Sequence, residues 1–240
     1  MDGTTLSRSA RGLTYLASHP RHALLWTRDR LRPRTPLELG LPWISWPCID
    51  WLERQALTGR RVFEYGGGGS TLYFLARGCR VSTVENSEPW AARIRDTVGA
   101  TLGTEALARL TLTLVAMPEH PRAADRALAN DYVNALGAGS EFDVILVDGA
   151  DGELGLRMEC LTRAREHLSP SGFVLLDDAW RTDYARSLEI LRGFERTVFE
   201  GAGPARWGVT RTDVFERVYT QARLGVSKQE STDETDHGKS

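Results

Sequence analysis

The sequence has few cysteines and no long apolar stretch. Its 240 residues include three cysteines, Cys48, Cys79 and Cys160, and no C-x-x-C pair, so we expect neither a disulfide framework nor a structural zinc site. No apolar run approaches the ~20 residues that a transmembrane helix requires, and the first residues lack the apolar core of a secretory signal. These absences predict a cytoplasmic protein without a membrane partner.

An excess of positive charge is also missing. The sequence has 30 basic and 32 acidic residues, which gives a net charge of -2. Proteins that grip duplex nucleic acid usually carry a clear positive excess, so no nucleic-acid partner is expected. Hydrophobic residues at 41% and charged residues at 26% are typical of a globular chain that is long enough to bury a substantial core.

The first sixty residues differ from the rest. Between Arg8 and Arg34 the only acid is Asp29, and leucines recur at loosely helical spacings that Pro20 interrupts. One or two short helices are predicted there, followed by a helix that begins near Pro47. A basic amphipathic arm of this kind could bind an anionic membrane or nucleic acid, but a helix packed on the domain through its leucines is the commoner arrangement.

From residue 61 onward, short apolar strands alternate with helical segments. This alternation is typical of parallel β-α-β units and predicts an α/β fold with a doubly wound, mostly parallel, seven-stranded sheet. The last strand follows its predecessor without a helix, so it is predicted to run antiparallel. The expected strands are 61–65, 80–84, 110–116, 142–147, 173–176, 196–200 and 213–219, with a turn over 169–172. The expected helices are 70–77, 88–98, 153–167 and 184–192.

A glycine loop follows the first strand, at the sheet edge where open α/β folds bind ligands. In F-E-Y-G-G-G-G-S-T, the four glycines at 66–69 would let the backbone approach a ligand closely. A dinucleotide site of the G-x-G-x-x-G type would need glycine where Thr71 stands. Glu64 suits an ammonium better than a pyrophosphate, and Glu85, at the end of the second strand, can accept both hydroxyls of a ribose. The set fits an adenosine ligand with a positively charged amino-acid end.

This pattern resembles the first two motifs of class I S-adenosylmethionine-dependent methyltransferases. F-E-Y-G-G-G-G-S-T and V-S-T-V-E-N are similar to the branch with an acid-x-G-x-G-x-S-T loop, and the similarity covers about residues 42–220. The resemblance implies a Rossmann-like methyltransferase fold with S-adenosylmethionine as the cofactor. Gly66, Gly68 and Ser70 would then line the methionine end, Glu64 would lie near its amino group, and Glu85 would hold the ribose.

The resemblance also implies a full cofactor site and a division of the chain. Where the family often has a polar residue for the adenine, this sequence has Ala116 and Met117, so packing and backbone groups would take over that role. An N-terminal helical extension (1–58), a methyltransferase domain (59–222) and a disordered polar tail (223–240) are expected. The implied cofactor-binding residues are Glu64, Tyr65, Gly66, Gly67, Gly68, Ser70, Thr71, Glu85, Asn86, Met117 and Asp148.

Three aspartates, Asp148, Asp177 and Asp178, end neighbouring strands and are expected to converge at the sulfonium of the cofactor. The D-G-x-D and D-D-x-W arrangement is similar to that of metal-dependent O-methyltransferases, which implies that the three carboxylates bind Mg²⁺ next to the acceptor hydroxyl. Without a metal, Asp148 or Asp178 could act as general base, and Tyr184 is a further catalytic candidate. Carboxylates that only cap the following helix remain an alternative.

Other candidates surround the expected acceptor site. Trp43 and Trp46 would form either a lid or part of the core. Tyr132, in the helical insertion before the fourth strand, would contact the acceptor. His120 is expected to be exposed, and Cys160 is expected to pack as a small hydrophobe.

The sequence therefore predicts a methyltransferase that acts on an oxygen or nitrogen of a small-molecule acceptor, with a tailoring step in secondary metabolism, or natural product biosynthesis, as the expected setting. A homodimer built on the tryptophan-rich N-terminal segment is the expected assembly. Two alternatives stay open. One is an NAD-dependent oxidoreductase that uses the same glycine loop, and the other is a non-catalytic partner protein that binds S-adenosylmethionine.

Overall fold

The computed structural model describes residues 3–31, 33–206 and 208–218, with side chains from residue 9 onward. A central seven-stranded sheet has the order β3-β2-β1-β4-β5-β7-β6, and β7 runs antiparallel to both of its neighbours. The expected α/β class, the seven strands and the antiparallel last strand are confirmed. The strands are β1 (Arg61–Tyr65), β2 (Arg80–Glu85), β3 (Leu110–Leu114), β4 (Phe142–Val147), β5 (Leu168–Leu176), β6 (Phe194–Gly201) and β7 (Thr210–Arg217).

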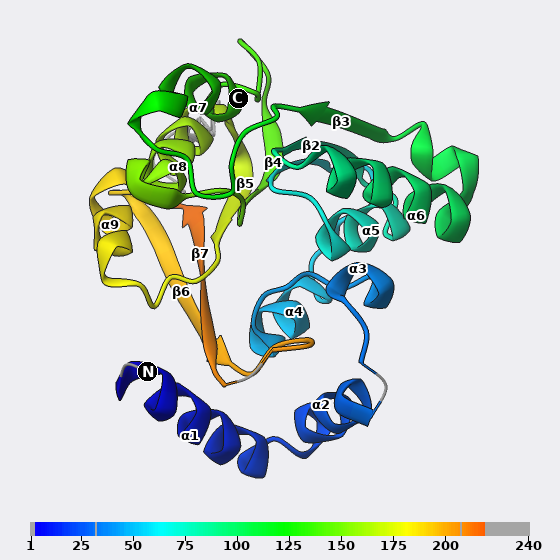
Figure 1. Cartoon of the computed structure of the whole chain (residues 1–240), viewed down its shortest axis with the longest axis vertical. Helices are drawn as coiled ribbons and strands as arrows, with labels where there is room; N and C mark the ends of the chain where they lie inside the picture. Colours follow the sequence, from blue (N-terminus) through cyan, green and yellow to red (C-terminus); the bar gives the residue numbers. More distant parts are fainter. Residues whose placement is uncertain (1–2, 32, 207, 219–240) are drawn as a thin grey trace, which may run out of the picture.

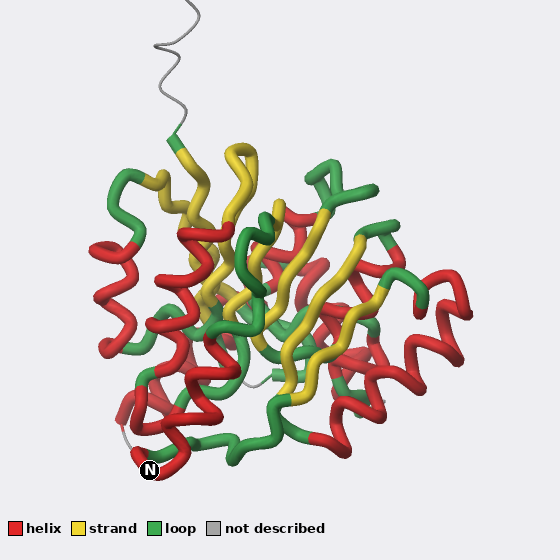
Figure 2. Tube along the Cα trace, turned by 90° about the horizontal axis from the view of Figure 1, so that it is seen from above, coloured by secondary structure: helices red, strands yellow, loops and turns green. Residues whose placement is uncertain are grey.

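Helices cover both faces of this twisted sheet (Figures 1 and 2). In Figure 1, α4, α5 and α6 lie to one side of the sheet and α7, α8 and α9 lie to the other. The α-helices are α1 (Gly3–Ser18), α2 (Pro20–Leu31), α3 (Pro36–Leu39), α4 (Trp46–Leu52), α5 (Gly69–Ala76), α6 (Glu88–Leu107), α7 (Arg126–Val133), α8 (Leu156–His167) and α9 (Ser187–Ile190). Short 3₁₀ helices span η1 (Ala123–Asp125), η2 (Gly152–Leu154) and η3 (Thr182–Arg186).

The central strands are buried on both faces, which explains why they appear in the sequence as continuous apolar runs. Along β4, Val144 and Leu146 pack into the core that lies beneath α4 and α5. Ile145 and Val147 alternate with them and pack into the second core, beneath α7 and α8. Side chains of successive strand residues point to opposite faces, so one short strand supplies both cores.

Several local predictions were wrong in their boundaries, and the helix expected over 88–98 runs on to Leu107. The expected turn at 169–172 lies inside β5, where the pairing with β4 shifts register between Phe142 and Val144. An irregularity of this kind accommodates Pro170, which has no N–H to donate to a regular ladder. The helix expected over 184–192 is split into η3 and the four-residue α9.

The N-terminal arm, formed by α1 and α2, lies below the rest of the domain in Figure 1. Pro20 separates its two helices and opens α2, a position that proline favours because the first helical N–H is unpaired anyway. His22 links the arm to α4, since it bonds Tyr15 Oη at 2.6 Å and Asp50 Oδ2 at 2.9 Å. The sequence did not suggest this buried contact.

Two further predictions concern membranes and the tail. Among the described helices, none is long and apolar enough to cross a membrane. The tail predicted at 223–240 lies outside the described residues.

Candidate active site

The glycine loop connects β1 to α5, and two of its glycines are required by the packing of the protein itself. Gly66 has φ +85°, and a Cβ there would lie 2.6 Å from the Cα of Gly149 in the loop after β4. A Cβ on Gly69 would lie 2.3 Å from the carbonyl oxygen of Pro36 and 2.1 Å from that of Leu41. The segment around α3 therefore rests directly on the start of α5.

Glu64 lies beneath this loop and is fully buried. Its Oε2 accepts a hydrogen bond from Thr71 Oγ1 at 2.6 Å, and the same hydroxyl accepts one from the N–H of Gly68 at 3.0 Å. Burial raises the pKa of Glu64 to about 7, while the nearby hydroxyls of Ser70 and Thr71 act in the opposite direction. Its Oε1 is buried without a partner, which leaves one acceptor atom free for a donor on a ligand.

Glu85, at the end of β2, also faces the glycine loop. Its Oε2 accepts from the N–H of Gly67 at 3.1 Å, and its Oε1 accepts from those of Asn86 and Ser87 at 2.9 Å each. Burial raises the pKa of Glu85, and these three amides oppose that rise. The carboxylate is therefore oriented by backbone donors at the place where the sequence predicted a ribose acceptor.

Asn86 and Met117 extend this row to the end of β3. The Asn86 side chain donates to the Met117 carbonyl at 3.2 Å, and the Met117 N–H donates to the Asn86 carbonyl at 3.2 Å. The indole of Trp90, which the sequence did not single out, donates to the Gly67 carbonyl at 2.9 Å. Parallel strands that end at one edge bring these predicted cofactor residues together.

Three predicted tyrosines, Tyr65, Tyr132 and Tyr184, have buried side chains. The hydroxyl of Tyr65 donates to the Val133 carbonyl at 2.7 Å, so its side chain is part of the core below α7. Tyr132 is buried in the same core. Tyr184 is buried as well and donates to Asp151 at 2.7 Å. The hydroxyls of Tyr132 and Tyr184 both lie against the loop after β4, where a Cβ on Gly149 would be 1.9 Å from Tyr132 Oη.

The three strand-end aspartates are paired with arginines. Arg206, in the loop between β6 and β7, donates to Asp177 Oδ2 at 3.0 Å and to Asp178 Oδ1 at 3.1 Å. Arg157, near the start of α8, lies 3.2 Å from Asp148 Oδ1. The aspartates therefore converge at one edge, as predicted, but two guanidinium groups lie among them (Asp148, Asp177 and Asp178).

This arrangement does not fit the predicted Mg²⁺ site. Both oxygens of Asp177 are engaged, one by Arg206 and the other by Thr212 Oγ1 at 2.7 Å. The part of the chain that the structure describes contains no group of three or more His, Cys, Asp or Glu residues arranged to hold a metal. Fixed cations beside the carboxylates oppose the approach of a divalent ion, so we derive no step through a metal.

The pKa values of Asp148 and Asp178 are shifted in opposite directions. Burial raises the pKa of Asp148 to about 7, with a further contribution from Asp177. Burial also acts to raise the pKa of Asp178, but the Arg206 guanidinium and a hydrogen bond from Trp180 hold it below its ordinary value. The Asp148 side chain keeps 18% of its surface exposed. Asp148 therefore combines access from solvent with a pKa that suits proton exchange near neutral pH.

Trp43 and Trp46, the two tryptophans predicted to form a lid or part of the core, differ in burial. Trp46 is buried and stacks on His22 at a ring distance of 5.9 Å, so it belongs to the core. Trp43 is 48% exposed, and the Arg206 guanidinium lies 4.8 Å from its ring centre. Of the smaller candidates, His120 is exposed and Cys160 is buried, as expected.

Sequence reasoning missed Arg157 and Arg206. No motif marks either residue, and each lies in a region that the sequence left unassigned or treated as an ordinary helix. The available signal was chemical. Three carboxylates predicted at one buried edge required counter-charges, and a chain with arginine in almost every basic position could supply them.

The fold is the Rossmann-like methyltransferase fold, as the resemblance implied. An O-methyltransferase from Bacillus cereus in complex with SAH is similar at 19% identity and a TM-score of 0.55, over 81% of this chain and 97% of that one. TomG, an O-methyltransferase from Streptomyces achromogenes in complex with SAM, matches at 15% identity and 0.52, over 91% and 100% of the two chains. No protein-family model and no curated protein matches the sequence.

Replacing Glu64 by glutamine is expected to change the pH dependence of stability. With a pKa raised from 4.5 to about 7, native Glu64 holds a proton between these values and the unfolded chain does not. Stability contributed by Glu64 therefore falls as the pH rises through this window, and above it the buried charge costs up to about 3 kcal/mol. Glu64→Gln removes that cost.

The measurement is urea unfolding of the ligand-free protein at pH 5 and pH 8. We expect Glu64→Gln to be more stable than the wild type at pH 8 and equal to it at pH 5. Glu141→Gln, at an exposed position, is the control and should match the wild type at both values. A Glu64→Gln protein that gains no stability at pH 8 would show that the native pKa of this carboxyl is not raised above its unfolded value.

Proposed function

We propose that the protein transfers the methyl group of S-adenosylmethionine to an oxygen or nitrogen atom of a small-molecule acceptor. The row formed by Glu64, the glycine loop and Glu85 is the observation that carries the proposal. It offers a partnerless acceptor atom at the methionine end and an oriented carboxylate at the ribose end. The similar folds of the Bacillus cereus enzyme in complex with SAH and of TomG in complex with SAM support it.

Each end of the cofactor would meet a different part of this row. Glu64 Oε1 would accept from the ammonium, Glu85 would accept from the ribose hydroxyls, and Asn86 with Met117 would border the adenine. When bound, the cofactor supplies a methyl group that is already electrophilic. The protein then contributes mainly by holding the acceptor in line with that methyl group.

Asp148 is the residue that we assign to proton removal. It follows β4 at the edge of the sheet, next to the loop glycines, because its N–H donates to the Tyr65 carbonyl at 3.1 Å. Its pKa of about 7 lets it accept a proton from the acceptor near neutral pH. Asp178 stays ionised beside Arg206, so its part is to hold that guanidinium rather than to move a proton.

The alternatives are less consistent with the site. A nicotinamide cofactor would bring a pyrophosphate to the loop, where the carboxyl of Glu64 lies beneath the glycines and Thr71 replaces the third glycine of that motif. A non-catalytic binding protein would not need Asp148 at the edge with a raised pKa. TomG, which is involved in tomaymycin synthesis, supports a setting in secondary metabolism. The proposed homodimer would use the exposed indole of Trp43.

Calorimetric titration of S-adenosylhomocysteine, with NADH as the control ligand, tests this proposal. We expect saturable binding of S-adenosylhomocysteine and no binding of NADH. Binding should be equal in Mg²⁺ and in EDTA, because guanidinium groups already neutralise the aspartates. Binding of NADH in place of S-adenosylhomocysteine would overturn the proposed function.

A further inference from the structure

A pocket of about 410 Å³ lies where β1, β2 and β3 begin, at the end of the sheet opposite the glycine loop. This volume falls within the range of small-molecule sites. Three arginines supply its charge, namely Arg61 and Arg80, the first residues of β1 and β2, and Arg109, which precedes β3. None of the residues that line the pocket is acidic. The pocket is therefore basic, and it lies apart from the row of cofactor residues.

The parallel pairing of β1 with β2 places two of these arginines side by side. Arg61 and Arg80 are partners in the ladder, so their side chains leave the same face of the sheet. Further along this face, Phe63 and Val84 pack into the core beneath α7 and α8. Like charges directly opposite each other on neighbouring strands are destabilising. An anion between the two guanidinium groups would remove this repulsion.

The acids near this pocket leave most of its positive charge unbalanced. Glu141 lies 4.0 Å from Arg61 Nη2, and the two side chains are 60% and 50% exposed, so this ion pair is weak. Asp143 accepts from the N–H of Arg61 at 2.8 Å and from the Ser169 hydroxyl at 2.9 Å, which engages both of its oxygens. Within the described chain, the Arg80 side chain makes no hydrogen bond or ion pair.

Arg109 and two hydroxyl groups add further donors to the pocket. The Arg109 guanidinium makes one hydrogen bond, from Nη2 to the Leu75 carbonyl at 3.0 Å, and its Nε is buried without a partner. Ser82 and Thr111 also line the pocket, at paired positions of β2 and β3. Neither hydroxyl bonds another group of the described residues. The pocket thus combines several unused donors with positive charge.

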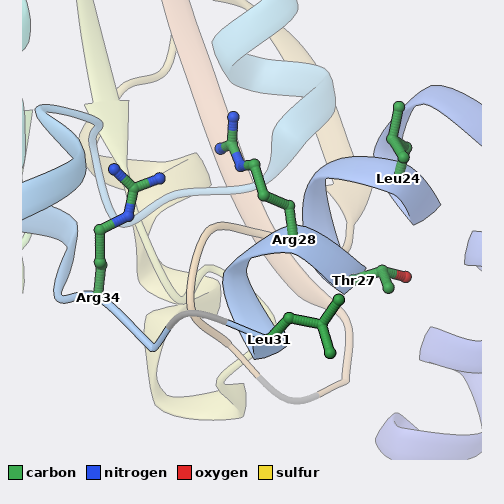
Figure 3. A pocket seen from close by; sticks show the side chains of 5 residues that line it. All are labelled: Leu24, Thr27, Arg28, Leu31 and Arg34. Carbon is green, nitrogen blue, oxygen red and sulfur yellow. The ribbon is translucent and has the colours of Figure 1, made fainter.

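A pocket of similar size, about 430 Å³, lies along α2 and differs from this one (Figure 3). It is on the exposed face of that helix, where Leu24 and Leu31 are 72% and 78% exposed. One of its two arginines, Arg28, bonds its neighbour Asp29 through Nε at 3.1 Å and Nη2 at 3.0 Å. The other, Arg34, follows the helix, so no strand pairing holds the two side by side. These two arginines therefore provide a comparison of equal charge.

We propose that Arg61 and Arg80 bind a phosphate group, free or carried by a small molecule, in the pocket at the strand starts. Guanidinium groups form strong, charge-assisted hydrogen bonds with phosphate oxygens, and two of them side by side can bind one dianion. Ser82 and Thr111 would donate to the same group. A net charge of -2 on the whole chain and the volume of the pocket favour a small ligand over a nucleic acid. This site does not depend on the proposed methyl transfer.

Titrations followed by ³¹P NMR test the proposal, with inorganic phosphate, phenyl phosphate and a short oligothymidylate as probes. Each probe is titrated into the full chain without S-adenosylhomocysteine. The variant is Arg61→Gln/Arg80→Gln, and the matched control is Arg28→Gln/Arg34→Gln, which removes the same charge from the pocket along α2. Arg61 and Arg80 are both exposed, so the variant should fold, and circular dichroism with urea unfolding verifies this for both proteins.

We expect inorganic phosphate or phenyl phosphate to bind the wild type and the control equally, and the Arg61→Gln/Arg80→Gln variant roughly 10-fold or more weakly, since hydrogen bonds to a charged group are lost. Tighter binding of phenyl phosphate identifies an organic phosphate as the ligand, and tighter binding of inorganic phosphate identifies the free ion. Equal weakening in the two double variants, or no phosphate binding by the wild type, overturns the proposal. Preference for the oligothymidylate would also overturn it, because the ligand would then be a nucleic acid.

Discussion

Glu85→Ala is expected to weaken the binding of S-adenosylhomocysteine at least 100-fold. The substitution removes the proposed acceptor of the ribose hydroxyls. It also removes the acceptor of three backbone N–H groups, those of Gly67, Asn86 and Ser87. A hydrogen bond to a charged group contributes about 1.5–3 kcal/mol, so the loss of two ribose bonds alone corresponds to more than a 100-fold change.

Isothermal calorimetry measures this effect, with two further variants beside it. Glu85→Gln keeps an acceptor oxygen and should lose less affinity than Glu85→Ala. Glu119→Gln removes a nearby negative charge that raises the pKa of Glu85, and its side chain is exposed, so binding should stay at the wild-type level. Wild-type affinity in a folded Glu85→Ala protein would contradict the assignment of Glu85 to the ribose.

Arg206→Met is expected to destabilise the protein by about 3–5 kcal/mol at pH 8, because it leaves buried carboxylates without a counter-charge. Asp177 is fully buried, and Asp178 depends on the same guanidinium. Burial raises the pKa of Asp177, and Arg206 opposes that rise, so its removal raises this pKa further. The variant also loses the interaction that keeps the pKa of Asp178 low.

Both carboxyl pKa values are higher in Arg206→Met than in the wild type, so both changes destabilise the variant more as the pH rises. Urea unfolding at pH 5 and pH 8 measures this effect. An acid whose native pKa is raised loses stability as the pH rises from its unfolded value through its native value. The loss in Arg206→Met should therefore be smaller at pH 5 than at pH 8. Arg196→Met is the control, because Asp213 keeps its second partner Arg211. A loss that does not depend on pH would show that packing, and not charge, is the role of Arg206.

The position of the candidate active site could be predicted from the local pattern of strands and helices in the sequence. Apolar runs separated by helical segments define parallel strands, and the residues after such strands must meet at one edge of the sheet. Glu64, Glu85 and Met117 could be placed together for this reason, although 53 residues separate the first from the last. The same argument predicted that Asp148, Asp177 and Asp178 converge, which they do.

The sequence could not show how the side chains at that edge would be paired. Tyr65 belongs to the predicted loop motif, but strand alternation turns its side chain into the core, where it donates to Val133. Tyr184 follows the paired aspartates closely and bonds Asp151 instead. A motif specifies the path of the backbone, whereas the direction of each side chain depends on which face its neighbours cover.

The sequence by itself determined the strands, their order along the chain and the edge at which ligands are expected to bind, because these depend on short-range periodicity and on the geometry of parallel pairing. Only the tertiary structure showed which side chains balance the negative charge of the aspartates at that edge. Arg206 and Arg157 reach the aspartates from an irregular loop and from a helix, and no periodic pattern encodes such contacts. The structure likewise showed that the N-terminal arm rests on the loop between β6 and β7, where Trp26 and Arg30 donate to the Arg206 carbonyl, since long-range packing sets where an arm of helices lies.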